Sequence, residues 1–435
     1  MKIEKPILVT QPTLPPLEDF IPYLIDIWET KILTNNGPFH QQLENEIASF
    51  LGVPYISLFA NGTLALITAL KALDLKGEVI TTPYSFVATS HSLLWNNLKP
   101  VFVDLDLNSH NIDIPDLKKK INNSTKVIHI TYLSGLVPNM DEIKEICKEN
   151  DLILIEDISQ AYGANYKNKI CGTFGNVSIG SFSLGKTISS NGGGVVIIND
   201  DKIKKNFENL FDNELSLPSK LFLIKLNLNQ ILIKILTSKL IFNFFTYYLF
   251  FLIKKISKST FNDPEMKNKF FSSLNKGNYY KNIPFIRKNY PNSLMKKMSD
   301  SQCQIAQNCF DNLIKNNKKN QDIAKLYFEN LNEKFLNNIP KNSLDYTQNV
   351  YWHFPIHIFK NYELFKDYMF QNGVDCVSYG LPLISGLDAF EEFKLNMPNS
   401  EKVKYNTIFF PLHPDFTIKD IKKLIKTINN FNYEI

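Results

Sequence analysis

Residues 40–200 alternate between short apolar runs and longer segments with the periodicity of helices. The runs are rich in β-branched and aromatic residues and are bounded by turn residues: Tyr55–Phe59, Glu78–Thr82, Pro100–Asp104, Val127–Thr131 and Leu152–Glu156. Between them lie the expected helices Thr63–Leu73, Ser85–Asn96, Ile114–Ile121 and Met140–Asn150. Because parallel strands need crossover connections, this rhythm predicts an α/β fold with a mostly parallel sheet covered on both faces. Ligands are then expected at the carboxyl ends of the strands.

The remainder of the chain departs from this rhythm. With 435 residues the chain is long enough for two or so domains. We predict a large domain over residues 1–205, an apolar insertion within 206–295, and a smaller α+β domain over 296–435. A long helical pattern from Met298 to Asn332 opens the last of these.

Composition excludes several classes of function. The formal net charge is +5 and Arg287 is the single arginine, so neither a basic nucleic-acid footprint nor arginine forks for guanine can be built. The five cysteines include no CxxC pair, which favours reduced thiols in the cytoplasm. The first residues carry no apolar export signal. No metal site is expected, because Pro355 interrupts the helix that His353 and His357 would need.

Two candidate ligand sites follow predicted strands. Asn61-Gly62-Thr63 lies between a strand and a helix, where free backbone N–H groups and the positive helix end suit a phosphate. The alternative is that Thr63 simply caps the helix. Phe86 follows the next strand and could stack on a planar ring, although most such residues pack in a core.

Two further candidates carry charge. Asp157 ends a strongly apolar strand, where a buried carboxylate needs a partner; the alternative is a cap on the next helix. Lys186 lies between a serine cluster and three glycines. A lysine shielded from water has a lowered pKa and becomes an amine nucleophile, whereas the alternative is an exposed loop lysine.

In this chain order, these elements resemble the DegT/DnrJ/EryC1/StrS family of PLP-dependent sugar aminotransferases, which has the aspartate-aminotransferase fold (PLP fold type I). The similarity is carried by Leu33–Pro38, Asn61–Leu66, Pro83–Thr89, Pro100–Asp104, Glu156-Asp157, Ser181-Phe182, Lys186, Met298–Asp300, Tyr379–Pro382 and Phe410–Pro414. The segments Thr34–Phe39 and Thr81–Phe86 resemble the branch acting on dTDP-4-keto-6-deoxyglucose. The resemblance implies a seven-stranded-type sheet flanked by helices.

The resemblance also implies roles for single residues. Lys186 would bind pyridoxal 5'-phosphate covalently and then move the substrate proton, and Asp157 would pair with the pyridine nitrogen. Gly62, Thr63 and Ser181 would hold the phosphate, with Ser183 in reserve. Phe86 would stack on the ring, Gln160 would contact it, and Asn292 of a neighbouring subunit would reach the phosphate.

Three departures from the family pattern concern the substrate half of the site. Tyr132 and Ser378 stand where the family usually has histidines, and the segment after Asn292 lacks the usual arginine. A lysine or backbone amides would therefore have to hold the carboxylates of an amino-acid donor.

The resulting expectation is a homodimeric aminotransferase that converts a nucleotide-linked keto-deoxysugar, dTDP- or UDP-4-keto-6-deoxy, to an amino sugar for cell-surface polysaccharide. Glutamate is the expected donor. One alternative is a non-catalytic scaffold member at the membrane face, and another is a PLP-dependent sugar dehydratase. The lysine at position 186 disfavours the dehydratase, since that branch has a histidine there.

Residues 221–256 form an intensely apolar stretch where the family has a short segment. The 14 residues between Lys239 and Lys254 would make a helix of roughly 21 Å, against a hydrocarbon core of ~30 Å. The open alternatives are a helical hairpin packed on the body or across the dimer, a peripheral contact with the inner membrane face, and a true span. Lysines that could meet anionic lipid bracket the apolar runs.

Overall fold

The structure is a computed structural model that describes two long stretches of the chain. They are residues 37–215 without 184 and 191, and residues 296–432 without 341–346, 375, 377–380 and 413–415, together with the single positions 18, 21, 22, 25, 29, 228 and 241. The predictions for Asn292, Ser378 and nearly all of 221–256 therefore lie outside the described residues.

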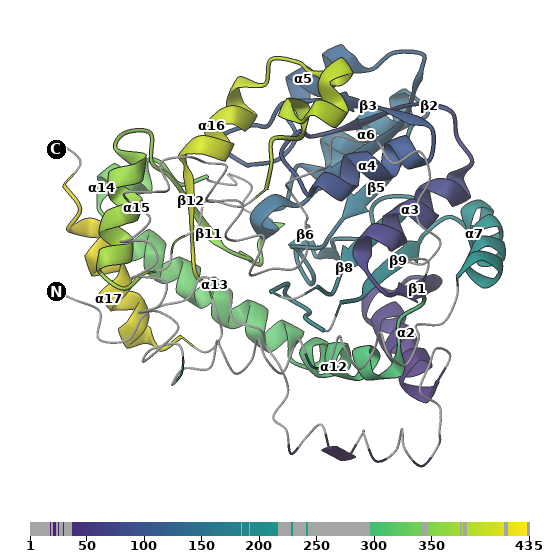
Figure 1. Cartoon of the computed structure of the whole chain (residues 1–435), viewed down its shortest axis with the longest axis horizontal. Helices are drawn as coiled ribbons and strands as arrows, with labels where there is room; N and C mark the ends of the chain where they lie inside the picture. Colours follow the sequence, from purple (N-terminus) through teal and green to yellow (C-terminus); the bar gives the residue numbers. More distant parts are fainter. Residues whose placement is uncertain are drawn as a thin grey trace.

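A seven-stranded sheet in the order β1-β9-β8-β5-β4-β2-β3 forms the centre of the molecule (Figure 1). Its strands are β1 (Tyr55–Phe59), β2 (Gly77–Thr81), β3 (Leu98–Phe102), β4 (Thr125–Thr131), β5 (Ile153–Asp157), β8 (Val177–Ser181) and β9 (Gly194–Ile198). The five strands β3, β2, β4, β5 and β8 run parallel, and β9 is antiparallel to both of its neighbours. The predicted mostly parallel sheet is confirmed.

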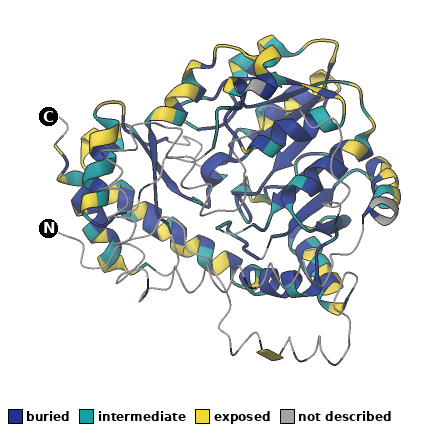
Figure 2. Ribbon diagram, viewed as in Figure 1, coloured by how far each residue is buried: buried dark blue, intermediate teal, exposed yellow. Residues whose placement is uncertain are grey.

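Apolar residues alternate between the two faces of this sheet, and both faces are buried beneath helices (Figure 2). On one face Val127 and Ile155 pack with α3 (Gly62–Leu73) and α7 (Asp201–Glu214). On the other, Ile128 packs with residues of the helices α2 (Pro38–Leu51), α6 (Met140–Glu149) and α12 (Asp300–Asp311). Burial on both faces explains why the strands are apolar throughout.

The predicted strands and helices of residues 40–200 agree with the structure to within two residues at each boundary, with α4 at Val87–Trp95 and α5 at Ile114–Lys120. The single helix predicted from Met298 to Asn332 is wrong. It is two helices, α12 and α13 (Leu313–Asn330), because Asn312 leaves helical geometry (φ −96°, ψ 1°). Asparagine favours such breaks since its side chain competes for backbone hydrogen bonds.

Residues after α12 contribute a second apolar core around the antiparallel pair β11 (Phe354–His357) and β12 (Thr407–Phe410). Helices α13, α14 (Glu333–Leu336), α15 (Tyr362–Gln371), α16 (Pro398–Asn406) and α17 (Ile418–Asn429) accompany it. A small sheet of β10 (Thr347–Gln348), β6 (Asn165–Tyr166) and β7 (Lys169–Ile170) links the two parts.

The boundary predicted at residues 205/206 falls inside α7, whose Phe207 and Phe211 belong to the core of the large sheet. The domain limits otherwise stay a prediction. Within the described ranges, no helix has both the length and the apolar character needed to cross a membrane.

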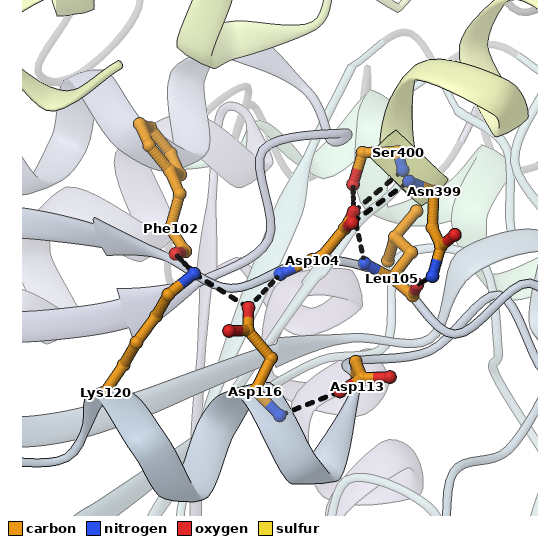
Figure 3. A network of polar contacts seen from close by, with 8 residues as sticks. All are labelled: Phe102, Asp104, Leu105, Asp113, Asp116, Lys120, Asn399 and Ser400. Carbon is orange, nitrogen blue, oxygen red and sulfur yellow. Dashed lines mark hydrogen bonds and ion pairs between the residues drawn. The ribbon is translucent and has the colours of Figure 1, made fainter. Parts of the chain in front are cut away.

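A buried aspartate fastens the C-terminal part to the sheet (Figure 3). Asp104, two residues after the end of β3, accepts hydrogen bonds from the Ser400 amide (2.8 Å) and hydroxyl (2.6 Å) and from the Asn399 amide (3.0 Å). These amides belong to the first turn of α16, so a carboxylate from another segment caps this helix. Asp116 and Lys120 hold the segment that carries Asp104. Asp116 accepts from the Asp104 amide at 2.9 Å and from the Lys120 ammonium at 2.7 Å.

We predict that Asp104→Asn lowers the free energy of unfolding by about 2–3 kcal/mol, because an amide replaces a carboxylate that accepts from four donors, the Leu105 amide at 2.8 Å among them, and turns an N–H group toward them. Urea unfolding followed by circular dichroism measures the change. The control is Asp322→Asn, which removes an exposed helix ion pair and should change stability by less than about 0.5 kcal/mol. Equal effects of the two substitutions would contradict the role assigned to Asp104.

Candidate active site

The start of α3 meets the end of β8 at the carboxyl edge of the sheet. Asn61 caps the helix, with its Oδ1 accepting from the Leu64 amide at 2.8 Å, so the alternative interpretation of Thr63 as the cap is wrong. The amides of Gly62 and Thr63 belong to the first turn, which has no carbonyl partners within the helix. A Cβ on Gly62 would lie 2.8 Å from Cβ of Ser181. Glycine is therefore required for α3 to approach Ser181, and the three candidate phosphate ligands come together.

Strand register places Asp157 on the same face as Ser181. Asp157 is opposite Ile179 in the parallel pair β5–β8, and Ser181 follows Ile179 by two residues. The Asp157 side chain is 7% exposed, and its Oδ1 accepts from the Ser159 amide at 2.9 Å. This bond closes a turn, since the chain after Asp157 is not helical, and the alternative of a helix cap is wrong.

Glu156, the neighbour of Asp157, points to the opposite face and serves the fold. It is fully buried and accepts from the amides of Gly172 (2.8 Å), Phe174 (2.7 Å) and Gly175 (2.6 Å). The Ser178 and Tyr132 hydroxyls also donate to it. Every acceptor position is thus in use, which leaves Asp157 as the carboxylate of the pair available to a ligand.

Lys186 lies in the loop after β8. Burial lowers the pKa of its ammonium to about 8, and the negative charge of Asp157 works in the opposite direction. The backbone of this loop is fixed on both sides of the lysine: the Lys186 amide donates to the Ser183 carbonyl (3.1 Å), and the Ser189 hydroxyl donates to the Lys186 carbonyl (2.8 Å). A lysine with this pKa has a usable fraction of neutral amine near neutral pH.

The other candidates lie around the same edge. Phe86 precedes α4 and is 44% exposed, so it is not the core residue of the alternative interpretation. Gln160 is 6% exposed, and its Oε1 accepts from the Ser134 amide at 2.7 Å. Ser183 and Ser181 pair through their hydroxyl oxygens at 3.0 Å. Whether Phe86, Gln160 and the serines contact a cofactor stays a prediction.

Two residues that the sequence interpretation did not single out also belong to this region. Trp352 comes from the C-terminal part, yet its indole ring centroid lies 4.0 Å from Nζ of Lys186. His129 on β4 is fully buried; its Nδ1 pairs with the Thr81 hydroxyl (3.2 Å), and its Nε2 has no hydrogen-bond partner among the described residues. Burial lowers the pKa of His129, while Asp157 opposes this change. Neither residue lies in a recognisable motif.

Comparison with known proteins gives a match across most of the chain. The model of the DegT/DnrJ/EryC1/StrS aminotransferase family matches residues 17–218 and 258–429. The chain belongs to this family. The unmatched residues 219–257 coincide with the apolar stretch 221–256.

Curated members of the family match over part of their length. The chain is 48% identical over 208 residues to a dTDP-4-amino-4,6-dideoxy-D-glucose transaminase of Shigella dysenteriae, covering 48% of this chain and 57% of the relative. It is 35% identical over 198 residues to a GDP-perosamine synthase of Escherichia coli O157:H7, covering 45% and 54%. The chain therefore spans about half the length of the curated relatives it matches.

Solved structures of the family agree in fold. An aminotransferase from Brucella abortus has a TM-score of 0.73 at 19% identity, covering 96% of both chains. Helicobacter pylori PseC, an aminotransferase involved in the biosynthesis of pseudoaminic acid, has a TM-score of 0.73 at 20% identity, covering 98% of both. This likeness confirms the predicted α/β fold of the sugar aminotransferases.

For a DegT/DnrJ/EryC1/StrS member, the tyrosine at position 132 is a change in the core. Tyr132 is fully buried, its hydroxyl donates to Glu156, and its pKa is raised well above the usual value, mainly by burial. Glu156 faces away from Asp157, so Tyr132 supports the sheet from the side opposite the candidate site. Tyr132 thus has a structural role, as a buried partner of Glu156.

The two adjacent carboxylates allow a paired test. Glu156→Gln should lower the free energy of unfolding by about 2–4 kcal/mol, because an amide N–H group would then face buried donors. Asp157→Asn should lower it by less than about 1 kcal/mol, since the new amide oxygen still accepts from Ser159. Urea midpoints of the two variants, measured without added cofactor, check this difference. A larger loss for Asp157→Asn would contradict the division of roles.

Proposed function

We propose that the chain is a PLP-dependent aminotransferase that converts a nucleotide-linked keto-deoxysugar to an amino sugar. The observation that carries the proposal is the enclosed Lys186, with a pKa of about 8, on the sheet edge that also holds Asp157. A dTDP- or UDP-4-keto-6-deoxy sugar is the proposed substrate and glutamate the proposed donor. The names of the curated relatives, which include dTDP- and UDP-sugar transaminases, support this substrate class.

The residues at this edge fit pyridoxal 5'-phosphate, the cofactor that the family implies. A Cβ on Gly62 would collide with Ser181, so the glycine lets the first turn of α3, with its free amide donors, lie directly beside the Ser181 side chain. Such a helix start favours a dianionic phosphate. Asp157 supplies an acceptor for a protonated ring nitrogen, and Lys186 supplies an amine.

In the proposed mechanism, Gly62, Thr63 and Ser181 would bind the phosphate, and Asp157 would keep the ring nitrogen protonated. The bound cofactor would supply an electron sink for the substrate carbon. Phe86 would stack on the ring. Lys186 would hold the cofactor covalently, and its released Nζ would accept the proton from the substrate carbon and return it, for which a pKa near 8 is suitable.

The non-catalytic alternative depended on two departures from the family pattern. One of them, Tyr132, contributes to the core, and the other, the arginine-less segment after Asn292, lies outside the described residues. Asp157 and Lys186 both remain in place for chemistry. A dehydratase is disfavoured by the lysine at position 186 itself.

Absorbance spectroscopy of the purified full chain with added pyridoxal 5'-phosphate tests the proposal. A visible band should form, persist through gel filtration, and bleach when glutamate is added, because the amino group then moves to the cofactor. Lys186→Ala should abolish the stable band. Lys169→Ala, an exposed lysine that packs over Phe174, is the matched control and should leave it unchanged. A full chain that stays colourless would refute the proposed function.

We further propose a cytoplasmic homodimer in which Asn292 reaches the neighbouring subunit's phosphate, with peripheral contact to the inner membrane face through 221–256. None of the five cysteines, all within the described part of the chain, is in a disulfide, which suits a reducing compartment. Support for the membrane contact comes from the apolar runs bracketed by lysines.

Deletion of 221–256 should move the protein from the membrane pellet to the supernatant, since it removes the apolar surface and several flanking lysines. Fractionation of cells without detergent, followed by immunoblotting, measures the distribution. If the full chain and the deletion variant are both found in the supernatant, the membrane contact is wrong.

A further inference from the structure

The indole of Trp352 covers the amine of Lys186. Nζ lies 4.0 Å from the ring centroid, well within the range of a cation–π contact. The two residues come from different parts of the chain, since Lys186 follows β8 of the large sheet and Trp352 precedes β11 of the second core. The contact is therefore built by the tertiary fold.

Trp352 is held in this position by hydrogen bonds at both ends. Its Nε1–H donates to the Gly185 carbonyl at 2.6 Å, and its backbone N–H donates to the Ser134 carbonyl at 2.9 Å. The bond from the backbone N–H requires two segments of the chain to approach closely. A Cβ on Gly135 would lie 3.0 Å from the backbone nitrogen of Trp352, and Gly135 has a φ of +76°. Gln160 fixes the same turn by accepting from the Ser134 amide.

These bonds connect the indole to the lysine loop itself. Gly185, whose carbonyl receives the indole N–H, is the residue directly before Lys186. The ring therefore cannot shift relative to the loop without losing a short hydrogen bond. Gln160, which was predicted to contact the cofactor, accepts from the Ser134 amide, and the Ser134 carbonyl in turn accepts from the backbone N–H of Trp352.

The charges around Nζ favour a cation at this place. The face of an indole carries negative electrostatic potential. The negative charge of Asp157 also favours the cation and partly offsets the lowering of the Lys186 pKa by burial. His353 is the other titratable group nearby, and its pKa is lowered to about 3 by burial and by the positive charge of Lys186. His353 is therefore neutral at pH 7 and adds no repulsion.

We infer that Trp352 is a positioning residue that holds the Lys186 ammonium whenever this amine is not bonded to the cofactor. The inference rests on the proposed function, because a transaminase lysine is released each time a substrate nitrogen takes its place. A released cation in a largely enclosed site needs a partner to offset its desolvation. The indole face is such a partner and carries no formal charge. The Lys186 Nζ therefore remains close to the reacting carbon and is not bound in an ion pair.

The test is to weaken the π face of Trp352 without changing its shape. Fluorinated tryptophans, up to the tetrafluoro form, are placed at position 352 of the full chain by stop-codon suppression. The pKa of Lys186 is then measured without cofactor, by labelling with acetic anhydride across a pH series and quantifying the Lys186 peptide by mass spectrometry. Only the neutral amine reacts, so the labelling rate rises with pH through the pKa.

The indole stabilises the charged form, and weakening it should lower the pKa of Lys186. From a starting value near 8, the full fluorine series should lower the midpoint by about 0.5–1 unit. Labelling at pH 7 should rise correspondingly, about 3–5-fold, because the fraction of neutral amine grows as the pKa falls toward 7. The same fluorine series at Trp95, whose ring stacks on His91 in α4, is the matched control and should leave the midpoint unchanged.

Two results would overturn the inference. One is an unchanged midpoint across the series at position 352. The other is a shift produced by Trp352→Phe but not by fluorination, which would mean that the indole acts only through its bond to Gly185. Both results are independent of cofactor binding. A chain that shows the fluorine shift but never binds pyridoxal 5'-phosphate would refute the proposed function and leave the Trp352 contact standing.

Discussion

The division of two adjacent carboxylates at the end of β5 underlies the rest of the structure. Glu156 draws three backbone amides of residues 172–175 and two hydroxyls to one face of the sheet, which fixes the loop that leads into β8. Asp157, one residue later, is turned to the opposite face by the pleat of the strand. The position of Asp157 relative to Ser181 and Lys186 therefore depends on a buried carboxylate that never meets a ligand.

The site is completed by parts of the chain that lie far apart in sequence. Its floor comes from the ends of parallel strands and the start of α3, while Trp352 reaches it from the second core. Asp104 and the first turn of α16 join the same two parts at the edge strand β3. These two contacts, one at the sheet edge and one above the lysine, act together with the small β10-β6-β7 sheet to hold the C-terminal part against the large sheet.

Local pattern was sufficient to predict five strands of the sheet, whereas β8 and β9 were not among the predicted strands. The strand Tyr55–Phe59 is predicted to the residue because turn residues bound a short apolar run, and Asp157 follows from its place at a strand end. The alternative interpretation named Thr63 as the cap of α3, whereas Asn61 is the cap, since both residue types cap helices and only geometry separates them. The break at Asn312 was missed because apolar periodicity continues across it. Trp352 could not be found at all, because its contact with the lysine loop spans 167 residues and depends on how two cores pack.

The close contact between Gly62 and Ser181 limits how this chain can vary during evolution. Removing the Ser181 side chain would not make room for a larger residue at 62, because the new Cβ would still lie 3.2 Å from the Gly180 carbonyl oxygen and from Cα of Ser181. The conflict is with backbone, so no compensating substitution at a single neighbouring position relieves it. Position 181 can accept other small residues that leave the strand in place. Position 62 has no such freedom, because a side chain there meets the backbone of β8 whatever residue stands at 181.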